Sequence, residues 1–288
     1  MSDFSTLQGL AIPEGVVTQI ADESGMVLWA VSGGKVILEV EKITSNTYAG
    51  ETSYSNEEFI LLDIYPKTNG TVKVTYGGLT KTIKDTSGAE EPNAQQVFFG
   101  TFNGISDEVE TPASGELIID GRFCAFACGT FTKSASGKVV TNYPGCITAV
   151  KEWGEVTSIP ANAFRNGKGF TSFAVPEGIT SIKNSAFNGC SNLTNLTLPS
   201  TLETIGTSVA FCSANYSVVL TINVLATTPP VWEDDGSADM GLLYRSNSGN
   251  NIIIVPKGCL DAYKAAPGWS LYAALDGQNQ TVTMKEAE

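Results

Sequence analysis

The chain has 288 residues, of which 42% are hydrophobic, and this length and composition allow two or three folded cores. Acidic residues (30) outnumber basic residues (17), the formal net charge is −13, and no basic run is present, so we expect neither nucleic acid nor anionic lipid as a partner. No apolar stretch approaches the roughly 20 residues of a membrane span, so no membrane insertion is expected.

Three further features of composition bear on the class of protein. Residues 1–10 lack the basic start and apolar centre of a secretory signal, which predicts synthesis in a cytoplasm. Histidine is absent, which removes the commonest general base and metal ligand, so we expect no enzyme, cofactor or metal. Six cysteines are too sparse for a disulfide scaffold, and we expect them to be mostly reduced and buried: Cys124, Cys128, Cys146, Cys190, Cys212 and Cys259.

Residues 12–31 contain two apolar runs around the sequence Asp-Glu-Ser-Gly at 22–25. Glycine adopts the positive φ that a tight turn between antiparallel strands often requires. The pattern predicts a β-hairpin, and Ser-Gly-Gly at 32–34 predicts a short hinge. We therefore expect an N-terminal attachment hairpin and hinge over residues 1–34.

Residues 35–132 contain successive strand-like segments separated by turn signals, such as Thr-Asn-Gly at 68–70. Apolar and polar residues alternate between 71 and 76, which places Val72, Val74 and Tyr76 on one face of a half-buried antiparallel strand. These features predict an immunoglobulin-like β-sandwich of six or seven strands over residues 35–132.

Two features of the sequence could suggest a metal site. Cys124 and Cys128 would share one face of a strand, but there is no second pair and no histidine, which favours buried packing over metal ligation. The acidic groups lack the alternating ligands of a calcium loop, so we expect them to be solvated: Glu90-Glu91, Asp107-Glu108 and Glu233-Asp234-Asp235.

A sequence repeat of period 23 begins near Cys146. Four apolar columns recur at this period: Ile147/Phe170/Leu193, Val150/Phe173/Leu196, Val156/Ile179/Leu202 and Ile159/Ile182/Ile205. An Ala-Phe pair also recurs, at Ala163-Phe164 and Ala186-Phe187, and again at Ala210-Phe211, one position later than the period requires. A unit of this size cannot bury its own apolar edge, so neighbouring units are expected to stack over one core. We predict a short solenoid over residues 133–226.

One unit reads Leu193-x-x-Leu196-x-Leu198-Pro199-x-x-Leu202-x-x-Ile205, and Cys190 follows the preceding Ala186-Phe187. This unit resembles leucine-rich repeats of the BspA type, and the resemblance covers about residues 147–224. It implies the fold more than a function, since such repeats occur in bacterial surface proteins, protist proteins and phage virion proteins. The N-terminal segment and the sandwich resemble modules of phage tail, fibre or head-appendage proteins.

The C-terminal part, residues 227–288, is expected to form a loop and a cap. Residues 251–260 read as a strand and 261–269 as a helix, an order that resembles the segment closing BspA-type arrays. Without a cap the last repeat would expose its apolar edge to water. We expect Leu260, Tyr263 and Trp269 to cover that edge.

Candidate binding residues come from two places. The outward positions between the apolar columns line the predicted sheet face and are small or polar: Ala149, Lys151, Ser172, Ala174, Asn195 and Thr197. The loop at 227–250 carries residues of the kinds that dominate interfaces: Trp232, Leu242, Leu243, Tyr244 and Arg245. For Trp232 and Leu242 we favour the alternative that they cap the last repeat.

These features predict a non-enzymatic structural protein of a phage virion, a tail, fibre or head-decoration component that mediates attachment or host-surface contact. The N-terminal segment would bind other virion proteins, the repeats would contact a host-surface protein or glycan, and the chain could form a homo-oligomer. The alternative is a leucine-rich-repeat adhesin on a bacterial cell surface. A glycan-cleaving enzyme would need a cleft with two carboxylates, for which no motif is present.

Overall fold

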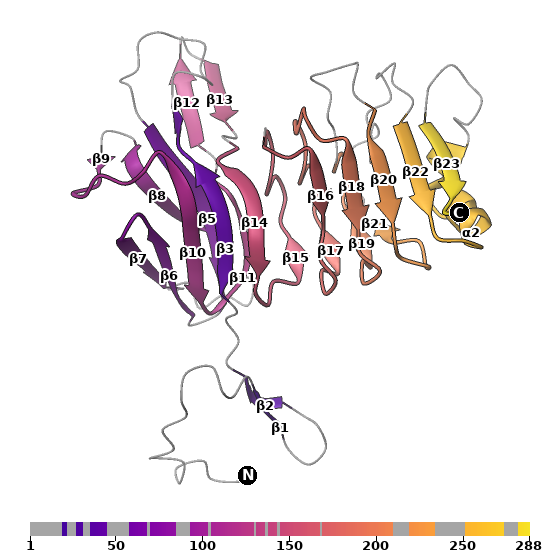
Figure 1. The fold of residues 1–288 in the computed structure, drawn as a ribbon, viewed down its shortest axis with the longest axis horizontal. Coiled ribbons are helices and arrows are strands. Elements are labelled where there is room, and N and C mark those ends of the chain that lie inside the picture. The colour runs from indigo at the N-terminus through magenta and orange to yellow at the C-terminus, as the bar shows by residue number, and fades with distance from the viewer. Residues whose placement is uncertain are drawn as a thin grey trace.

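The computed structural model describes residues 19–21, 27–30, 35–44, 58–67, 70–84, 93–102, 105–129, 131–135, 138–142, 145–167, 169–209, 219–233, 251–273 and 282–288. This part of the chain is mainly β, as predicted, with antiparallel sheets followed by a stack of short parallel strands (Figure 1). The immunoglobulin-like type of the sandwich stays a prediction. No helix among these residues is long and apolar enough to cross a membrane.

Two antiparallel sheets form a β-sandwich. The first has the order β14 (Ile147–Trp153), β3 (Val36–Glu41), β10 (Ser114–Gly121), β6 (Thr71–Tyr76) and β7 (Leu79–Lys84). The second has the order β11 (Phe123–Cys128), β5 (Glu58–Pro66), β8 (Gln95–Phe102) and β9 (Ile105–Ser106), and β4 (Ile43–Thr44) also pairs with β5.

The alternation in β6 buries one face of that strand between the sheets. Val72, Val74 and Tyr76 are buried, as the sequence pattern predicts. The Tyr76 ring lies edge-on to Phe99 of β8, with 5.7 Å between ring centroids. Residues from both sheets therefore form one hydrophobic core.

Two antiparallel strand pairs lie outside these sheets. β1 (Gln19–Ala21) pairs with β2 (Val27–Ala30), within the segment expected to form the N-terminal hairpin. β12 (Phe131–Ala135) pairs with β13 (Lys138–Asn142). The second pair goes beyond the sequence prediction, although Ser-Gly at 136–137 is a known hairpin signal.

The repeat region contains two parallel sheets that run along a stack of rungs (Figure 1). The long sheet has the order β16 (Ser172–Ala174), β18 (Asn195–Leu198), β20 (Thr221–Val224), β22 (Asn251–Val255) and β23 (Val282–Glu286). The short sheet has the order β15 (Ser158–Ile159), β17 (Ser181–Ile182), β19 (Thr204–Ile205) and β21 (Val231–Trp232).

The pairing register of these sheets follows the sequence period. Phe173 pairs with Leu196, and Ile159 pairs with Ile182, in each case one repeat period apart. Val150 is half-buried, and the other described members of the apolar columns are buried: Ile147, Val156, Ile159, Phe170, Phe173, Ile179, Ile182, Leu193, Leu196, Leu202 and Ile205. The period therefore identifies the residues that build the core of the stack.

A turn forms the third side of each rung. Asn162, Ser185 and Ser208 occupy the same turn position in successive repeats, with φ of 61°, 59° and 52°. This left-handed conformation is disfavoured for most residues. Asn162 tolerates it because its side chain can bond locally, and Ser185 and Ser208 adopt it at the equivalent positions. Consecutive turns are joined by backbone hydrogen bonds, for example from Phe164 N to Ala186 O at 2.8 Å.

The sandwich covers the first rung and shares its core with the repeats. β14 carries Ile147, the first residue of the repeat pattern, yet it pairs with β3 of the sandwich. On the opposite sheet, Cys128 N donates to Ala163 O in the first turn at 2.8 Å. Buried residues of the sandwich and the repeats consequently belong to one cluster.

The described cysteines are not disulfide-bonded and differ in their degree of burial. Cys128, Cys146 and Cys190 are buried, whereas Cys124 and Cys259 are half-buried. The expectation that both cysteines of β11 are buried is therefore wrong for Cys124. The register of β11 on β5 shifts between Phe123 and Ala125, and this irregularity interrupts the alternation that would place both thiols on one face.

Two short helices, α2 (Leu260–Ala265) and α3 (Ser270–Ala273), lie at the C-terminal end of the stack (Figure 1). Tyr263 and Trp269 are fully buried there, while Leu260 is half-buried. The Tyr263 hydroxyl donates to Ala226 O at 2.7 Å, and Trp269 Nε1 donates to Pro230 O at 2.8 Å. The aromatic side chains thus satisfy carbonyl groups of the preceding rung.

Changing Tyr263 to phenylalanine is expected to weaken the dependence of stability on alkaline pH. Burial raises the pKa of Tyr263 above its ordinary value, as does the nearby Cys259. The unfolded chain therefore releases the phenolic proton first, near pH 10, and the free energy of unfolding falls as pH rises beyond that point. Urea midpoints at pH 8 and pH 11 measure the effect.

The variant should lose less stability than the wild type between these two pH values. Some loss should remain, because the pKa values of Tyr65 and Tyr76 are also raised, chiefly by burial. Equal losses in the two proteins would contradict the assignment to Tyr263.

Candidate functional site

Small side chains, polar except for the methyl group of Ala174, form two rows on the outward face of the long sheet. The first row is Ser172, Asn195 and Thr221, and the second is Ala174, Thr197 and Asn223, as the strand register aligns them. We call these six residues the polar rows. Neighbouring strands lie about 4.8 Å apart, so the hydroxyl and amide groups form a regular array of donors and acceptors.

The outward face changes character beyond the polar rows. Ile252 and Ile254 of β22 continue the two rows and are half-buried. Thr283 and Lys285 of the last strand follow them and are exposed. The long sheet therefore presents a polar area next to the sandwich and a narrow apolar stripe near its C-terminal edge.

Hydrogen bonds between rungs fix the backbone beneath the polar rows. Thr194 Oγ1 donates to Thr171 O at 2.9 Å, across one 23-residue repeat. Glu177 accepts from Ser200 N at 3.0 Å and from Ser200 Oγ at 2.7 Å. These bonds from Ser200 lower the pKa of Glu177, so this carboxylate remains charged at neutral pH.

Lys151 and Ala149 lie on β14, and thus on the first sandwich sheet and not on the long sheet. The expectation that they line the repeat sheet is wrong, because β14 pairs with β3. Lys151 Nζ lies 2.7 Å from Glu39 and 2.8 Å from Glu116. Hydrogen bonds to Glu116 and Glu39 raise the pKa of Lys151. This lysine is therefore engaged in surface ion pairs.

Trp232 lies on β21, where the sequence predicts a loop. Its ring is edge-on to Trp269 at 5.6 Å and lies 6.4 Å from Tyr272, so it packs against the C-terminal helices. This contact favours the capping alternative over a binding role. The remaining loop candidates lie outside the described residues: Leu242, Leu243, Tyr244 and Arg245.

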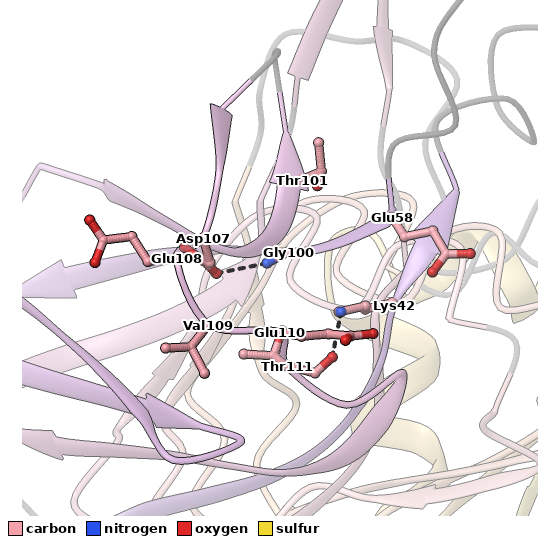
Figure 2. Close-up of a pocket in the computed structure, with 9 residues that line it drawn as sticks. All are labelled: Lys42, Glu58, Gly100, Thr101, Asp107, Glu108, Val109, Glu110 and Thr111. Atoms are coloured by element: carbon pink, nitrogen blue, oxygen red, sulfur yellow. Dashed lines mark hydrogen bonds between the residues drawn. The ribbon is translucent and has the colours of Figure 1, made fainter.

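A surface hollow of about 400 Å³ lies at the end of the sandwich (Figure 2). The residues that line it are Lys42, Glu58, Gly100, Thr101, Asp107, Glu108, Val109, Glu110 and Thr111. Lys42 Nζ donates to Thr111 O at 2.6 Å. Asp107 accepts from Gly100 N at 2.8 Å and pairs with Lys81 at 2.5 Å.

The charges around this hollow are engaged with the protein or directed to solvent. In Figure 2, Glu58 and Glu108 point away from each other on opposite sides of the hollow. Within the described residues, no group of three or more Asp, Glu, Cys or His side chains is placed to hold a metal ion. Glu90-Glu91 and Asp234-Asp235 lie outside those residues, while Glu233 pairs with Lys183 at 2.6 Å.

Comparison with known proteins identifies the repeat region alone. No curated protein and no solved structure matches the chain. The family match covers the part of the chain that contains the 23-residue period and the Leu-x-Leu strand. Residues 147–227 match the family described as the BspA type leucine rich repeat region, in six copies.

Proposed function

We propose that the protein is a non-catalytic interaction protein of the surface or adhesion class, and that the polar rows form its contact surface. The observation that carries the proposal is the register of short polar side chains on rungs that are hydrogen-bonded to one another. Such a face offers repeated donors and acceptors at fixed positions. Many weak contacts of this kind add up when several copies of the protein act together.

The proposal includes the architecture that presents this face. The stacked rungs form a short solenoid, and the sandwich, of immunoglobulin-like type, covers its first rung. The two C-terminal helices, with Tyr263 on α2 and Trp269 between α2 and α3, cover the other end. Repeat arrays need such caps because terminal rungs have no neighbour to bury their apolar edges. The hydrogen bonds from Cys128 to Ala163 and from Trp269 to Pro230 support this assignment.

Within this class we propose a phage virion component, attached through its N-terminal segment to other virion proteins and facing the host with its repeats. The support is the resemblance of residues 12–30 and of the sandwich to phage appendage modules. A bacterial cell-surface adhesin is the second candidate, favoured by the match of residues 147–227 to BspA-type repeats. Immunogold electron microscopy of virions and host cells separates the two. Labelling on cell surfaces without virions would contradict the virion role.

The contact surface is tested with one pair of matched variants. Thr197 and Thr204 lie on the long and the short sheet of the same rung, and both are half-buried. Thr197→Arg is expected to lower binding to immobilised bacterial polysaccharides or purified cell-envelope proteins at least tenfold, about 1.4 kcal/mol, through steric and charge mismatch.

Thr204→Arg is expected to leave that binding within about twofold of the wild type, since Thr204 belongs to the short sheet and not to the long sheet that carries the polar rows. Surface plasmon resonance with the full chain measures both variants, and thermal melting confirms that each remains folded. Equal binding by wild type and Thr197→Arg, or equal losses in the two variants, would refute the assignment of the polar rows.

A further inference from the structure

We propose that Cys128 and Cys146 form an intramolecular disulfide when the chain folds under oxidising conditions. This inference is independent of the proposed function. The two sulfur atoms lie 3.9 Å apart, and both residues are buried. A disulfide bond is about 2.04 Å long, so the sulfurs must approach by about 1.9 Å. The proposal requires the two side chains to make this approach by rotation about χ1.

Backbone hydrogen bonds hold the chain in place at both Cys128 and Cys146. Cys128 ends β11, and its N–H donates to Ala163 O at 2.8 Å. Cys146 directly precedes β14, and its carbonyl accepts from Glu41 N at 2.9 Å. The Cys146 thiol donates to Leu61 O at 3.2 Å. The two sulfurs are therefore held beside each other by strands of both sandwich sheets.

The cross-link would strengthen the junction between the sandwich and the repeats. β11 belongs to the second sheet and β14 to the first, so the bond would join the two layers covalently. It would also close the segment that contains the β12–β13 pair. Cys128 N is hydrogen-bonded to Ala163 O of the first repeat turn. A mechanical force applied to the repeats would therefore be transmitted to both sheets.

Oxidation of the pair requires an acceptor for two electrons, and a low-molecular-weight disulfide such as oxidised glutathione supplies it. The thiolate of one cysteine attacks this disulfide, forms a mixed disulfide and releases one glutathione. The thiolate of the other cysteine then attacks the protein sulfur of the mixed disulfide and releases the second glutathione. Two protein thiols are oxidised and one glutathione disulfide is reduced. Since both thiols are buried, the first attack takes place before the core closes or, in native protein, when the core opens transiently.

Other described cysteines lie in different surroundings. Cys190 donates to Phe164 O at 3.1 Å, and Cys124 donates to Tyr65 O at 3.4 Å. Cys124 neighbours the proposed pair in sequence and is half-buried. Replacing Cys124 therefore tests which of the two cysteines of β11, Cys124 or Cys128, forms the cross-link.

Peptide mapping of the full chain tests the proposal. The reduced protein is unfolded in urea, refolded with reduced and oxidised glutathione, alkylated and digested with trypsin. Cleavage after Lys133 and Lys138 separates Cys128 from Cys146, so their peptides, residues 123–133 and 139–151, stay joined only through a disulfide. We expect the joined pair in the wild type and in Cys124→Ala, and its loss in Cys128→Ala.

A second sample keeps the test independent of refolding. Native protein that is never unfolded is incubated with oxidised glutathione, and the same peptide pair is expected to form more slowly. Free thiols at both positions in both samples, or a bond from Cys146 to another cysteine, would overturn the proposal.

The cross-link is also expected to stabilise the fold. The bond would close a loop between two cysteines that lie 18 positions apart. Closing such a loop should raise the melting temperature by roughly 6–12 °C relative to the reduced protein. The double variant Cys128→Ala/Cys146→Ala should show no such response to oxidation. A cross-linked wild type that melts no higher than the reduced form would overturn its role in strengthening the junction.

Discussion

Changing Trp269 to alanine is expected to lower the free energy of unfolding by about 3–5 kcal/mol. The side chain is fully buried, and its ring lies 5.0 Å from Tyr263 and 5.6 Å from Trp232. Truncation removes this packing and also the donor to Pro230 O, which leaves a buried carbonyl without that partner. Urea unfolding followed by circular dichroism gives the loss directly.

Two variants control this experiment. Trp269→Phe keeps an aromatic ring but loses the Nε1 donor, so its loss should be smaller than that of the alanine variant. Val231→Ala changes a side chain in the same region that is 68% exposed, and it should alter stability by no more than about 0.5 kcal/mol. If Trp269→Ala behaved like Val231→Ala, the C-terminal helices would not act as a cap.

The repeat region could be predicted from the sequence because its signal is local and periodic. Ile159, Ile182 and Ile205 recur at the repeat period, and each is buried on the short sheet. A unit with one apolar edge must stack on a copy of itself, so the period determines both the pairing partner and the inward face. Four members of the polar rows followed from the same argument, since they occupy positions between inward residues: Ser172, Ala174, Asn195 and Thr197. Thr221 and Asn223 were added by the strand register.

The position of Lys151 could not be predicted in the same way. Residues 147–153 fit the repeat pattern, but their backbone pairs with β3, which lies far earlier in the chain. The apolar spacing of Ile147 and Val150 is compatible with either partner, because it describes the strand and not its neighbour. Only tertiary structure shows that the first repeat strand completes a sandwich sheet.

The sequence prediction also missed two short strands, β21 and β23. β21 has two residues and carries no pattern that distinguishes it from a loop, so the sequence places Trp232 in a loop. β23 does alternate, with Val282 and Met284 buried between polar residues, and this signal could have found it. Strands this short depend on their neighbours in the sheet more than on their own sequence.

Changing Phe164 to alanine is expected to cost about 3–5 kcal/mol and to separate the unfolding of the sandwich from that of the repeats. The Phe164 ring lies 6.2 Å from Phe126 and 6.1 Å from Trp153 on the sandwich side. On the repeat side it lies 5.0 Å from Phe173 and is stacked on Phe187 at 5.1 Å. One side chain therefore fills the junction from both directions, and its loss leaves a cavity there.

Urea unfolding of this variant is best followed by two signals, tryptophan fluorescence and circular dichroism of the whole chain. The fluorescence reports on Trp153 at the junction together with Trp29, Trp232 and Trp269. In the wild type the shared core predicts coincident transitions, because neither part can unfold without exposing the other. In Phe164→Ala the two transitions should diverge, while Phe164→Leu should keep them together with a smaller loss, since leucine refills most of the volume. Coincident transitions in the alanine variant would mean that backbone pairing of β14 with β3, and not the aromatic junction, couples the two parts.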